Sequence, residues 1–542
     1  MIPLPDKGGD GAHRPQKNRM SIYSPQSLGF PEFFDSFRDA QDEAIDYTLT
    51  CEKRFCAIGA PPGVGKSGIA FALAKLFGGR TIILTSNKGL EQQYCNTFGP
   101  AGLVNIHGRN NYQCWEGGSC EDGGRLGCKD HGGCPYKGAF AVQQASNIVI
   151  TNYAYWIAVG KVGGLRAPDT LICDEFGLAF EWLSRALDFT ISERECTSAG
   201  VRWTPPPGED VEDWMTRAPR IAAAAEAHLI KVRARLTPTN RHTLAKELKH
   251  AEGFVDRARQ LMRIDPSNFV CTRDDGTDWG RQWRFECVWP GKYKEMLFRS
   301  IPRVILLSAT LRPKTLQLNG IPRSECDFKE WPRQFPPANG PVVWVPTAKV
   351  KHGWSGEDEQ RWLERHAEIL AWGGDRKGLV HTVSYARAKR IGEYLSEQHG
   401  RNIILNGAAD PESATATQAF EKFKCSPDGT ALISPSFSTG WDFHGRLAEW
   451  QIISKIAFPD SRGKVMQART EADKTYPIYV AGQELAQGSG RVVRSEVDRG
   501  ATVIVDDSWK WFRHMVSEFI PRWFGVRKED HLPKPMKRAP ED

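Results

Sequence analysis

The chain has 542 residues, of which 40% are hydrophobic and 25% are charged, and it carries a formal net charge of +7. This length and apolar content are enough for three or more domains, each with its own core. The sequence contains no run of about 18 apolar residues and no signal-peptide core, which predicts a soluble protein of the cytoplasm with no membrane association. The small basic excess permits a polyanionic partner but does not require one.

A glycine-rich loop in the stretch "CAIGAPPGVGKSGIAFALAKLF" predicts a nucleotide-binding site. Gly63 and Gly65 allow the backbone to adopt positive φ and to approach phosphate groups without a Cβ in the way. Backbone N–H groups then converge on phosphate oxygens at the start of the next helix. In this arrangement Lys66 reaches the terminal phosphates and Ser67 offers its hydroxyl to Mg2+. We therefore expect ATP or GTP as the ligand.

Four of the 13 cysteines, Cys114, Cys120, Cys128 and Cys134, lie in the glycine-rich segment "CWEGGSCEDGGRLGCKDHGGC". Such a segment has little core of its own, so a bound metal centre is needed to hold it. Four thiolates can bind Zn2+ or an iron–sulfur cluster. The spacing of five, seven and five intervening residues is looser than the CxxC pairs typical of zinc. We predict a metal centre, and the spacing leaves both metals open.

Short apolar runs alternate with helical stretches along most of the chain, which predicts parallel sheets covered by helices. The first series is "RTIILTS", "NIVITN", "DTLICDE" and "RVILLSAT", and the second, after residue 340, is "GLVHTV", "RNIILNG", "TALISPS", "WQIISKIAF" and "ATVIVDD". Two series predict an α/β fold with two lobes. Between them, roughly residues 180–300 are rich in Ala, Lys and Arg and are predicted to be helical, largely without strands.

The strand "DTLICDE" ends in Asp174 and Glu175. From this position Asp can hold Mg2+ through water, and Glu can orient or deprotonate the attacking water. Downstream of a phosphate loop, such a pair indicates nucleotide hydrolysis. A second strand end, "LLSATL", places Ser308 and Thr310 where they are suited to sense the phosphate, although this tripeptide alone is also typical of a turn.

Near the C-terminus, "QGSGRVVRSEVDRG" contains Gln487, Arg491 and Arg494. Arginines three residues apart share one face of a helix. From there both would reach the γ-phosphate across a cleft and stabilise transition-state charge. A solvated basic helix face is the alternative. The apolar residues between the arginines and the two-lobe layout favour the functional interpretation.

Eight sequence blocks, in this order, resemble the XPD/DinG family of superfamily 2 helicases: "FRDAQDEAI", "GAPPGVGKS", "GRNNYQC", "CPYKGAFAVQQASNIVITNYAYW", "DEFG", "LLSATL", "STGWDF" and "QGSGRVVRSEVDRGATVIVDD". The resemblance implies two RecA-like motor lobes, with a four-cysteine 4Fe-4S domain and an arch domain inserted in the first. It also implies ATP-driven 5′ to 3′ translocation on single-stranded DNA and duplex unwinding. It favours iron–sulfur over zinc.

Carried onto this sequence, the resemblance implies that Gln41 contacts the adenine, that Gly440 and Asp442 couple the nucleotide to DNA, and that the second lobe completes the ATP site. The expected partners are single-stranded and forked DNA, with DNA–RNA hybrids as a further candidate, and the chain is expected to act as a monomer. The implied domains are 28–113 and 135–180 (first lobe), 114–134 (iron–sulfur insertion), 181–300 (arch-like insertion), 301–340 (end of the first lobe and linker) and 341–530 (second lobe), with 1–27 and 531–542 disordered.

The chain departs from the family at two motifs. Phe176 and Gly177 stand where the family usually has Ala-His, and Thr439 stands where Glu is common. Either change would loosen the coupling between hydrolysis and DNA movement. An alternative function is therefore an ATP-driven single-strand translocase or remodelling factor that removes R-loops or proteins and unwinds weakly. A third is a redox-sensing nucleic-acid-binding protein with a degenerate ATPase, against which the intact Lys66 argues.

Among the tryptophans, Trp115 lies beside a predicted cysteine ligand. We expect this side chain to contact DNA, because aromatic rings serve as stacking platforms for single strands. Packing over the metal centre is the alternative.

Overall fold

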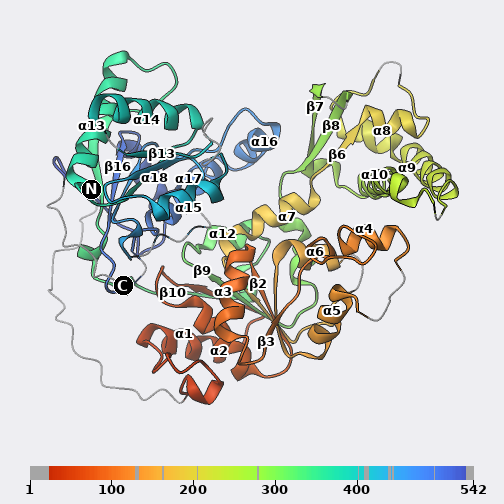
Figure 1. Cartoon of the computed structure of the whole chain (residues 1–542), viewed down its shortest axis with the longest axis horizontal. Helices are drawn as coiled ribbons and strands as arrows, with labels where there is room; N and C mark the ends of the chain where they lie inside the picture. Colours follow the sequence, from red (N-terminus) through yellow and green to blue (C-terminus); the bar gives the residue numbers. More distant parts are fainter. Residues whose placement is uncertain are drawn as a thin grey trace.

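The computed structural model of the chain describes residues 23–128, 133–160, 164–203, 206–237, 239–277, 280–400, 402–407, 414–437, 441, 443, 445–493 and 495–532. The disorder predictions for residues 1–22 and 533–542 fall outside these ranges. Figure 1 shows two α/β lobes next to each other, and a third body of yellow-green chain that stands beside the first lobe.

The first lobe is built on a seven-stranded parallel sheet with the order β10-β1-β9-β5-β2-β4-β3. Its strands are β1 (Phe55–Gly59), β2 (Thr81–Thr85), β3 (Leu103–Asn105), β4 (Ile148–Asn152), β5 (Thr170–Cys173), β9 (Arg303–Ser308) and β10 (Cys326–Glu330). Its helices are α1 (Asp39–Leu49), α2 (Lys66–Phe77), α3 (Lys88–Phe98), α6 (Tyr153–Gly160), α11 (Glu295–Phe298) and α12 (Pro313–Leu318). The segments that follow these parallel strands meet at one edge of the sheet.

The second lobe repeats this plan with the strand order β13-β14-β12-β15-β16-β11-β17, again parallel. Its strands are β11 (Val342–Ala348), β12 (Gly378–His381), β13 (Ile403–Leu405), β14 (Ala431–Ser434), β15 (Trp450–Ile453), β16 (Ala501–Asp506) and β17 (Val526–Lys528). Its helices are α13 (Gly356–Gly373), α14 (Tyr385–His399), α15 (Ala416–Cys425), α16 (Lys464–Ala472), α17 (Tyr476–Ser489) and α18 (Trp509–Val516).

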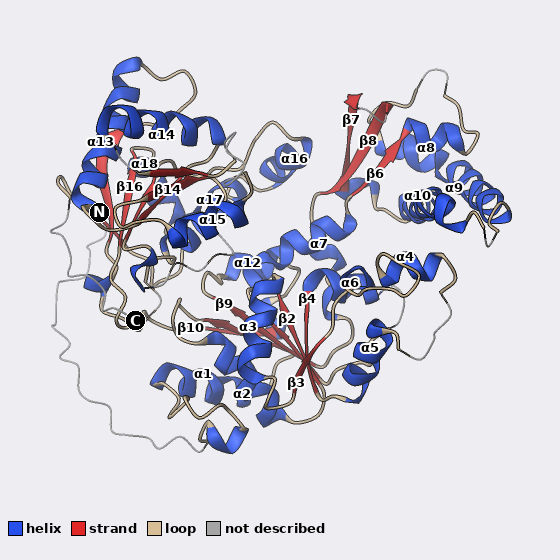
Figure 2. Ribbon diagram, in the orientation of Figure 1, coloured by secondary structure: helices blue, strands red, loops and turns tan. Residues whose placement is uncertain are grey.

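Both faces of the first sheet are covered by helices, which explains why its strands read as continuous apolar runs (Figure 2). Phe55 and Ala57 of β1 pack into a cluster on one face. Cys56 and Ile58 pack into a second cluster on the other face, together with apolar residues of α2 such as Phe71. Every residue of β1 is buried. The prediction of an α/β fold with two parallel-sheet lobes is confirmed.

All nine predicted apolar runs contain strands, and beside β1, which leads into the glycine-rich loop, the two lobes also contain β3, β10, β11 and β17. These additional strands have weak sequence signals. Strands β10 and β17 lie at the edges of their sheets, where burial on both faces is not required. In β11, Pro346 interrupts the run, and the pairing with β16 shifts register between Trp344 and Ala348.

The insertion between β5 and β9 contains α7 (Ala179–Leu187), α8 (Glu193–Ser198), α9 (Val211–Ala234) and α10 (Arg241–Leu261). It also contains a three-stranded antiparallel sheet of order β6-β8-β7, formed by β6 (Phe189–Ser192), β7 (Phe269–Thr277) and β8 (Gly280–Cys287). The helical prediction missed this sheet. In β8 only alternate residues, Trp283, Phe285 and Cys287, are buried, so the strand carries no continuous apolar run.

The cysteine-rich segment lies between β3 and β4 of the first lobe and contains the short helix α4 (Cys120–Arg125) and the helix α5 (Pro135–Ala145). Short 3-10 helices complete the structure: η1 (Gln26–Leu28), η2 (Arg109–Asn111), η3 (Phe176–Leu178), η4 (Pro266–Asn268), η5 (Pro290–Tyr293), η6 (Arg323–Glu325), η7 (Pro337–Asn339) and η8 (Gly445–Leu447). Within the described part of the chain, none of the helices combines the length and the apolar character that crossing a membrane needs.

Candidate functional site

The predicted nucleotide loop joins β1 to α2. Gly65 is the N-cap of α2 with φ 87°, and Gly63 has φ 81°. Glycine adopts these left-handed conformations without a Cβ penalty. A Cβ on Gly65 would also overlap the side-chain nitrogen of Gln41. Lys66 and Ser67 are the first two residues of α2, where unpaired backbone N–H groups and the helix dipole favour a phosphate.

Gln41 lies against this loop from α1. Its side chain is buried, and its Nε2 donates to the Gly65 carbonyl at 3.3 Å. Its Oε1 accepts from the backbone N–H of Arg38 at 2.9 Å, which caps α1. The Arg38 guanidinium in turn donates to the Gly63 carbonyl. Gln41 therefore borders the phosphate loop, and its contact with adenine stays a prediction.

Asp174 follows β5 at the same edge of the sheet and is buried. Its carboxylate accepts a hydrogen bond from the Tyr94 hydroxyl at 2.8 Å and one from the backbone N–H of Glu175 at 2.9 Å. Burial raises the pKa of Asp174 to about 6, and the neighbouring Glu175 charge adds to the rise, whereas Lys66 and Tyr94 oppose it. Lys66 is thus close enough to Asp174 for the two charges to interact.

Glu175 has a left-handed backbone, with φ 52° and ψ 42°. A residue with a side chain pays roughly 1–2 kcal/mol for this conformation, so the surrounding structure must impose it. The next residue, Phe176, is fully buried and packs against Phe298, with ring centroids 6.1 Å apart. The backbone N–H of Leu178 donates to the Glu175 carbonyl at 3.0 Å. These contacts hold the acidic pair at the strand end.

Ser308 and Thr310 lie beside the phosphate loop, because β9 pairs with β1 and places Ser308 opposite Gly59. Both side chains are buried. Gly177 packs directly against them: a Cβ on Gly177 would lie 3.2 Å from Ser308 Oγ and 3.3 Å from Thr310 Oγ1. From the second lobe, Gln487 Nε2 donates to Thr310 Oγ1 at 3.4 Å. The missing side chain at Gly177 leaves the space in which this link between the lobes forms.

The segment after α17 faces the phosphate loop. A Cβ on Gly490 would lie 2.9 Å from Pro62 Cγ, so the second lobe touches this loop closely. Helix α17 ends at Ser489, and Arg491 therefore lies beyond the helix. The prediction that Arg491 and Arg494 share one helix face is wrong for this reason. Arg491 Nη1 donates to the Trp441 carbonyl at 2.8 Å.

Three predicted site residues, Gly440, Asp442 and Arg494, lie outside the described residues, as does Thr439.

The four cysteines of the insertion approach one another in pairs. A hydrogen bond with the Cys114 thiol raises the pKa of Cys128. Burial raises the pKa of Cys120 to about 11, and the nearby Cys134 thiol adds to the rise. A Cβ on Gly123 would overlap the Cys114 sulfur. Within the described ranges, no group of three or more His, Cys, Asp or Glu side chains is gathered closely enough to hold a metal ion.

Trp115 covers part of this segment. Its indole N–H donates to the Gly133 carbonyl at 3.3 Å, and its side chain is 68% exposed. The Trp115 side chain therefore contacts the cysteine-rich segment through its N–H and leaves most of its surface exposed. Contact with DNA and packing over a metal centre both stay predictions.

A cavity of about 1880 Å3 lies where the first lobe, the cysteine-rich segment and the insertion meet. It is bordered at the carboxyl edge of the first sheet by Ser86, Asn87 and Lys88, which follow β2, and by Asn152, which ends β4. Its lining is rich in basic and aromatic side chains, and it also contains the acidic Glu121 and Asp256. The basic and aromatic residues are Lys88, Arg109, Lys137, Arg259, Arg263, Tyr136, Phe140, Tyr155, Trp182, Phe269 and Tyr293. The Arg109 guanidinium stacks over the Tyr136 ring at 5.1 Å from its centroid.

Ion pairs join the cysteine-rich segment to α10. Arg125 pairs with Glu252 at 3.2 Å, and Arg241 pairs with Glu116 at 2.8 Å. Arg241 also donates to the Leu126 carbonyl at 3.1 Å. The cysteine-rich segment is therefore docked on the insertion through charged side chains.

Sequence reasoning missed two residues that touch the predicted motifs. Tyr94 on α3 donates to Asp174 at 2.8 Å. Trp523, beyond α18, donates its indole N–H to the Ala309 carbonyl at 2.7 Å. Neither belongs to a recognisable motif, so their spacing along the chain carried no signal.

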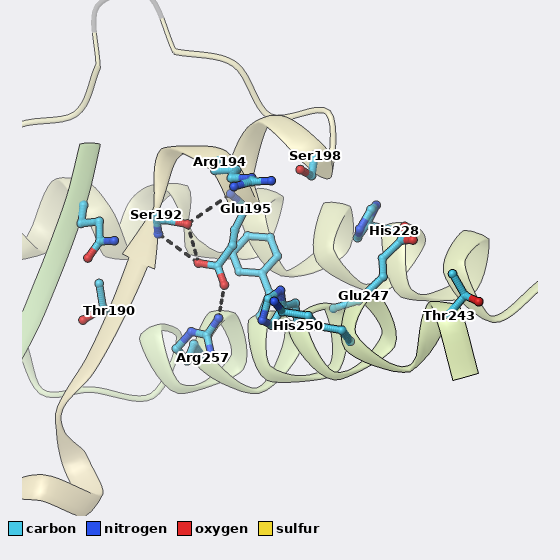
Figure 3. Close-up of a pocket in the computed structure, with 14 residues that line it drawn as sticks. Thr190, Ser192, Arg194, Glu195, Ser198, His228, Thr243, Glu247, His250 and Arg257 are labelled. Carbon is cyan, nitrogen blue, oxygen red and sulfur yellow. Dashed lines mark hydrogen bonds and ion pairs between the residues drawn. The ribbon is translucent and has the colours of Figure 1, made fainter. Parts of the chain in front are cut away.

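A separate hollow of about 890 Å3 lies within the insertion, between β6, α8, α9 and α10. Figure 3 shows the Glu195 carboxylate at its centre, bonded to Ser192 and Arg257. Glu195 and Ser192 form the capping box of α8, so this carboxylate is used to hold the helix. None of the predicted site residues lines this hollow.

Comparisons with known proteins agree with this geometry. Residues 370–525 match the helicase C-terminal domain family. The chain is 25% identical over 318 residues to the ATP-dependent DNA helicase DinG of Escherichia coli K12, a match that covers 54% of this chain and 43% of that protein. It is 27% identical over 195 residues to the ATP-dependent helicase DinG of Mycobacterium tuberculosis, covering 34% and 28%. The matched region thus spans less than half the length of these curated relatives.

Two solved structures share the fold at identities that show the fold alone. An XPD helicase superposes with a TM-score of 0.60 at 12% identity, covering 91% of this chain and 99% of the other. Xpd4 of S. tokodaii superposes with a TM-score of 0.56 at 10% identity, and the match covers 91% of this chain and 100% of the other. Residues 370–525 are therefore similar to a helicase C-terminal domain, and the described chain shares its overall fold with these two solved structures.

Proposed function

We propose that the chain is an ATP-dependent DNA helicase that translocates 5′ to 3′ on single-stranded DNA and unwinds duplex. The observation that carries the proposal is the presence of two sites at one edge of the first sheet. The phosphate loop and the acidic pair follow β1 and β5, and the basic, aromatic cavity borders the ends of β2 and β4. A movement at the nucleotide site would thereby reach the walls of the cavity through neighbouring strands of one sheet.

The cavity supports binding of a single strand. Its cations would supply charge for the phosphates, and its partly exposed rings, Phe140, Trp182 and Tyr293, would supply stacking surfaces that accept any base. A continuous helical duplex is less suited to a lining in which aromatic side chains alternate with cations, because paired bases expose only their edges. Forked DNA, with one free strand, is the substrate that this chemistry favours.

In the ATP site, Lys66 would neutralise the terminal phosphates and Ser67 and Asp174 would hold Mg2+. Bound Mg2+ supplies positive charge to the phosphate oxygens that gain negative charge during transfer. Glu175 would orient the attacking water. Gln487, Arg491 and Arg494 would complete the site from the second lobe, so that closure of the lobes assembles it. One chain supplies both halves of the site, which supports a monomer as the working form.

We also propose that Cys114, Cys120, Cys128 and Cys134 hold a 4Fe-4S cluster, with Zn2+ as the alternative. The paired thiols, and the close packing of the Cys114 sulfur on Gly123, where a Cβ would overlap it, support a thiolate-bound centre. Such a centre would keep the cysteine-rich segment folded against the cavity. Hydrolysis does not pass through it.

A translocase or remodelling factor with weak unwinding is the second candidate, and Phe176-Gly177 favours it. The side chain that usually follows the acidic pair is absent. Beside Gly177 the lobes are joined instead by the Gln487 bond to Thr310, at the long distance of 3.4 Å. A weak link of this kind would allow hydrolysis to proceed with fewer productive steps along DNA.

The test is strand separation by protein purified without oxygen, on forked, 5′-tailed and 3′-tailed duplexes with ATP. Lys66→Ala is the inactive variant, and Lys75→Ala, on the same helix but bonded only to the Ala101 carbonyl and the Phe71 ring, is its matched control. We expect unwinding of forked and 5′-tailed substrates by wild type and Lys75→Ala alone. Hydrolysis stimulated by single strands without separation would instead support the remodelling function, and the absence of both would refute the proposal.

A further inference from the structure

A short return segment, residues 518–523, leads back from the second lobe to the first after α18. The half-buried Trp523 at its end donates its indole N–H to the carbonyl of Ala309, at 2.7 Å. Ala309 is the middle residue of the loop from Ser308 to Thr310. The Trp523 ring also borders a small hollow together with Pro62 of the phosphate loop and Gly490 of the second lobe. One side chain of the second lobe therefore meets two loops of the first.

The return segment is anchored at two further points, both before this contact in the chain. Arg312 Nε donates to the Glu518 carbonyl at 3.1 Å, and the backbone N–H of Arg522 donates to the Glu330 carboxylate at 2.6 Å. Glu330 and Arg312 form an ion pair at 2.7 Å in which the glutamate side chain is only 6% exposed. Glu330 ends β10, opposite Gly59 of β1. The segment is thus held against β10, which pairs with the strand that leads into the phosphate loop.

Two side chains of the second lobe donate hydrogen bonds to adjacent residues of the same loop. Gln487 bonds to the side chain of Thr310, and Trp523 bonds to the main chain of Ala309. The hydrogen bond to the Ala309 carbonyl fixes the orientation of the peptide between Ala309 and Thr310, and with it the position of the Thr310 side chain. If the Ala309 peptide rotates, Thr310 Oγ1 moves away from Gln487. The shorter bond, at 2.7 Å, therefore sets the geometry on which the longer one, at 3.4 Å, depends.

We propose that Trp523 is a positioning residue of the ATP site, which holds the loop of Ser308–Thr310 in the arrangement that receives Gln487 when the lobes close. The inference rests on the proposed ATP hydrolysis. It assigns to the return segment a part in the hydrolytic step and not only in holding the lobes together.

The test replaces the indole donor and keeps an aromatic ring, in Trp523→Phe. The matched control is Trp511→Phe on α18, because the Trp511 ring stacks against Phe458 of its own lobe, with centroids 5.4 Å apart. We expect Trp523→Phe to lower kcat for DNA-stimulated hydrolysis by about fivefold, the rate equivalent of one lost hydrogen bond. KM for ATP is expected to stay within about twofold, because the variant leaves Lys66, Ser67 and Gln41 in place. Trp511→Phe is expected to keep the wild-type values.

Two further measurements separate positioning from simple stabilisation and from failure of the proposed function. Thermal unfolding midpoints of the two variants should agree. Hydrogen–deuterium exchange of the peptide that covers residues 304–312 should rise in Trp523→Phe and not in Trp511→Phe, and this readout needs no activity. An inactive wild type would refute the proposed function, and exchange would then decide the inference. A kcat equal to that of Trp511→Phe, or a loss that follows only the unfolded fraction, would overturn it.

Discussion

A single methyl group added at Gly177 is predicted to break the hydrogen bond between Gln487 and Thr310. In Gly177→Ala the new Cβ would lie 3.2 Å from Ser308 Oγ, 3.3 Å from Thr310 Oγ1 and 3.7 Å from Gln487 Nε2. The first two separations are shorter than ordinary van der Waals contact, so the neighbours must move by a few tenths of an ångström. The Gln487 bond to Thr310 is already 3.4 Å long, and a further displacement breaks it.

The size of the effect follows from the net value of one hydrogen bond, about 0.5–1.5 kcal/mol. If the bond forms as the lobes close for hydrolysis, its loss slows the reaction by about 2- to 12-fold. Because φ of Gly177 is not in the left-handed region, alanine introduces no backbone strain. We therefore expect a lower kcat for hydrolysis with saturating single-stranded DNA and little change in the free energy of unfolding.

The assay compares wild type, Gly177→Ala, Thr310→Val and the double variant. Thr310→Val removes the acceptor without adding bulk, so the double variant should be no slower than the slower single variant if both act through the same bond. Gly356→Ala is the control, because a Cβ there meets no atom within 4 Å. Hydrolysis by Gly177→Ala at the wild-type rate, or fully multiplicative effects in the double variant, would refute the reasoning.

Gly123→Ala is expected to displace the Cys114 sulfur, which a Cβ would overlap, and so to lower the iron and sulfide content of anaerobically purified protein. The control Gly124→Ala, whose new Cβ would lie 3.8 Å from its nearest neighbour, should keep the wild-type content. Equal iron and sulfide content in the two variants would contradict the proposed ligand set. Arg263→Ala should weaken single-strand binding about threefold at low salt, because one phosphate contact is lost. The slope of log affinity against log salt should become shallower by about 0.7. An unchanged slope in fluorescence anisotropy titrations would show that Arg263 does not contact the DNA strand. Burial lowers the pKa of His366 to about 4. Between about pH 6.5 and 4 the unfolded chain therefore binds a proton that the folded chain does not, and the free energy of unfolding decreases as the pH is lowered. His366→Gln should therefore reduce the loss of unfolding free energy between pH 7.5 and 5.5 by about 1.3 kcal/mol in urea titrations; an equal loss in both proteins would show that His366 is protonated in the fold.

Much of the nucleotide site could be predicted from short stretches of sequence. Gly63 and Gly65 have the left-handed backbone that a phosphate loop requires, and this need is visible because only glycine meets it at no cost. Asp174 follows a strand that is buried on both faces, and such strands appear as continuous apolar runs. In both cases the physical cause acts on neighbouring residues, so it leaves a local pattern.

The insertion shows where local patterns fail. Helices α9 and α10 have apolar residues at helical spacing and were predictable, whereas β8 buries only alternate residues such as Trp283 and Phe285. The charged residues between them resemble a helix surface in composition. Pairing with β6 and β7 stabilises this strand, and the partners are distant in the sequence.

The sequence by itself determined the type of chemistry, because the phosphate loop, the acidic pair and the strand series each depend on residues within a few positions of one another. The tertiary structure alone decided which residues of the second lobe reach the first. Gln487 bonds to Thr310, and Trp523 bonds to Ala309. These contacts join segments that only the packing of two separate sheets brings together, and no local rule of backbone conformation or burial encodes them.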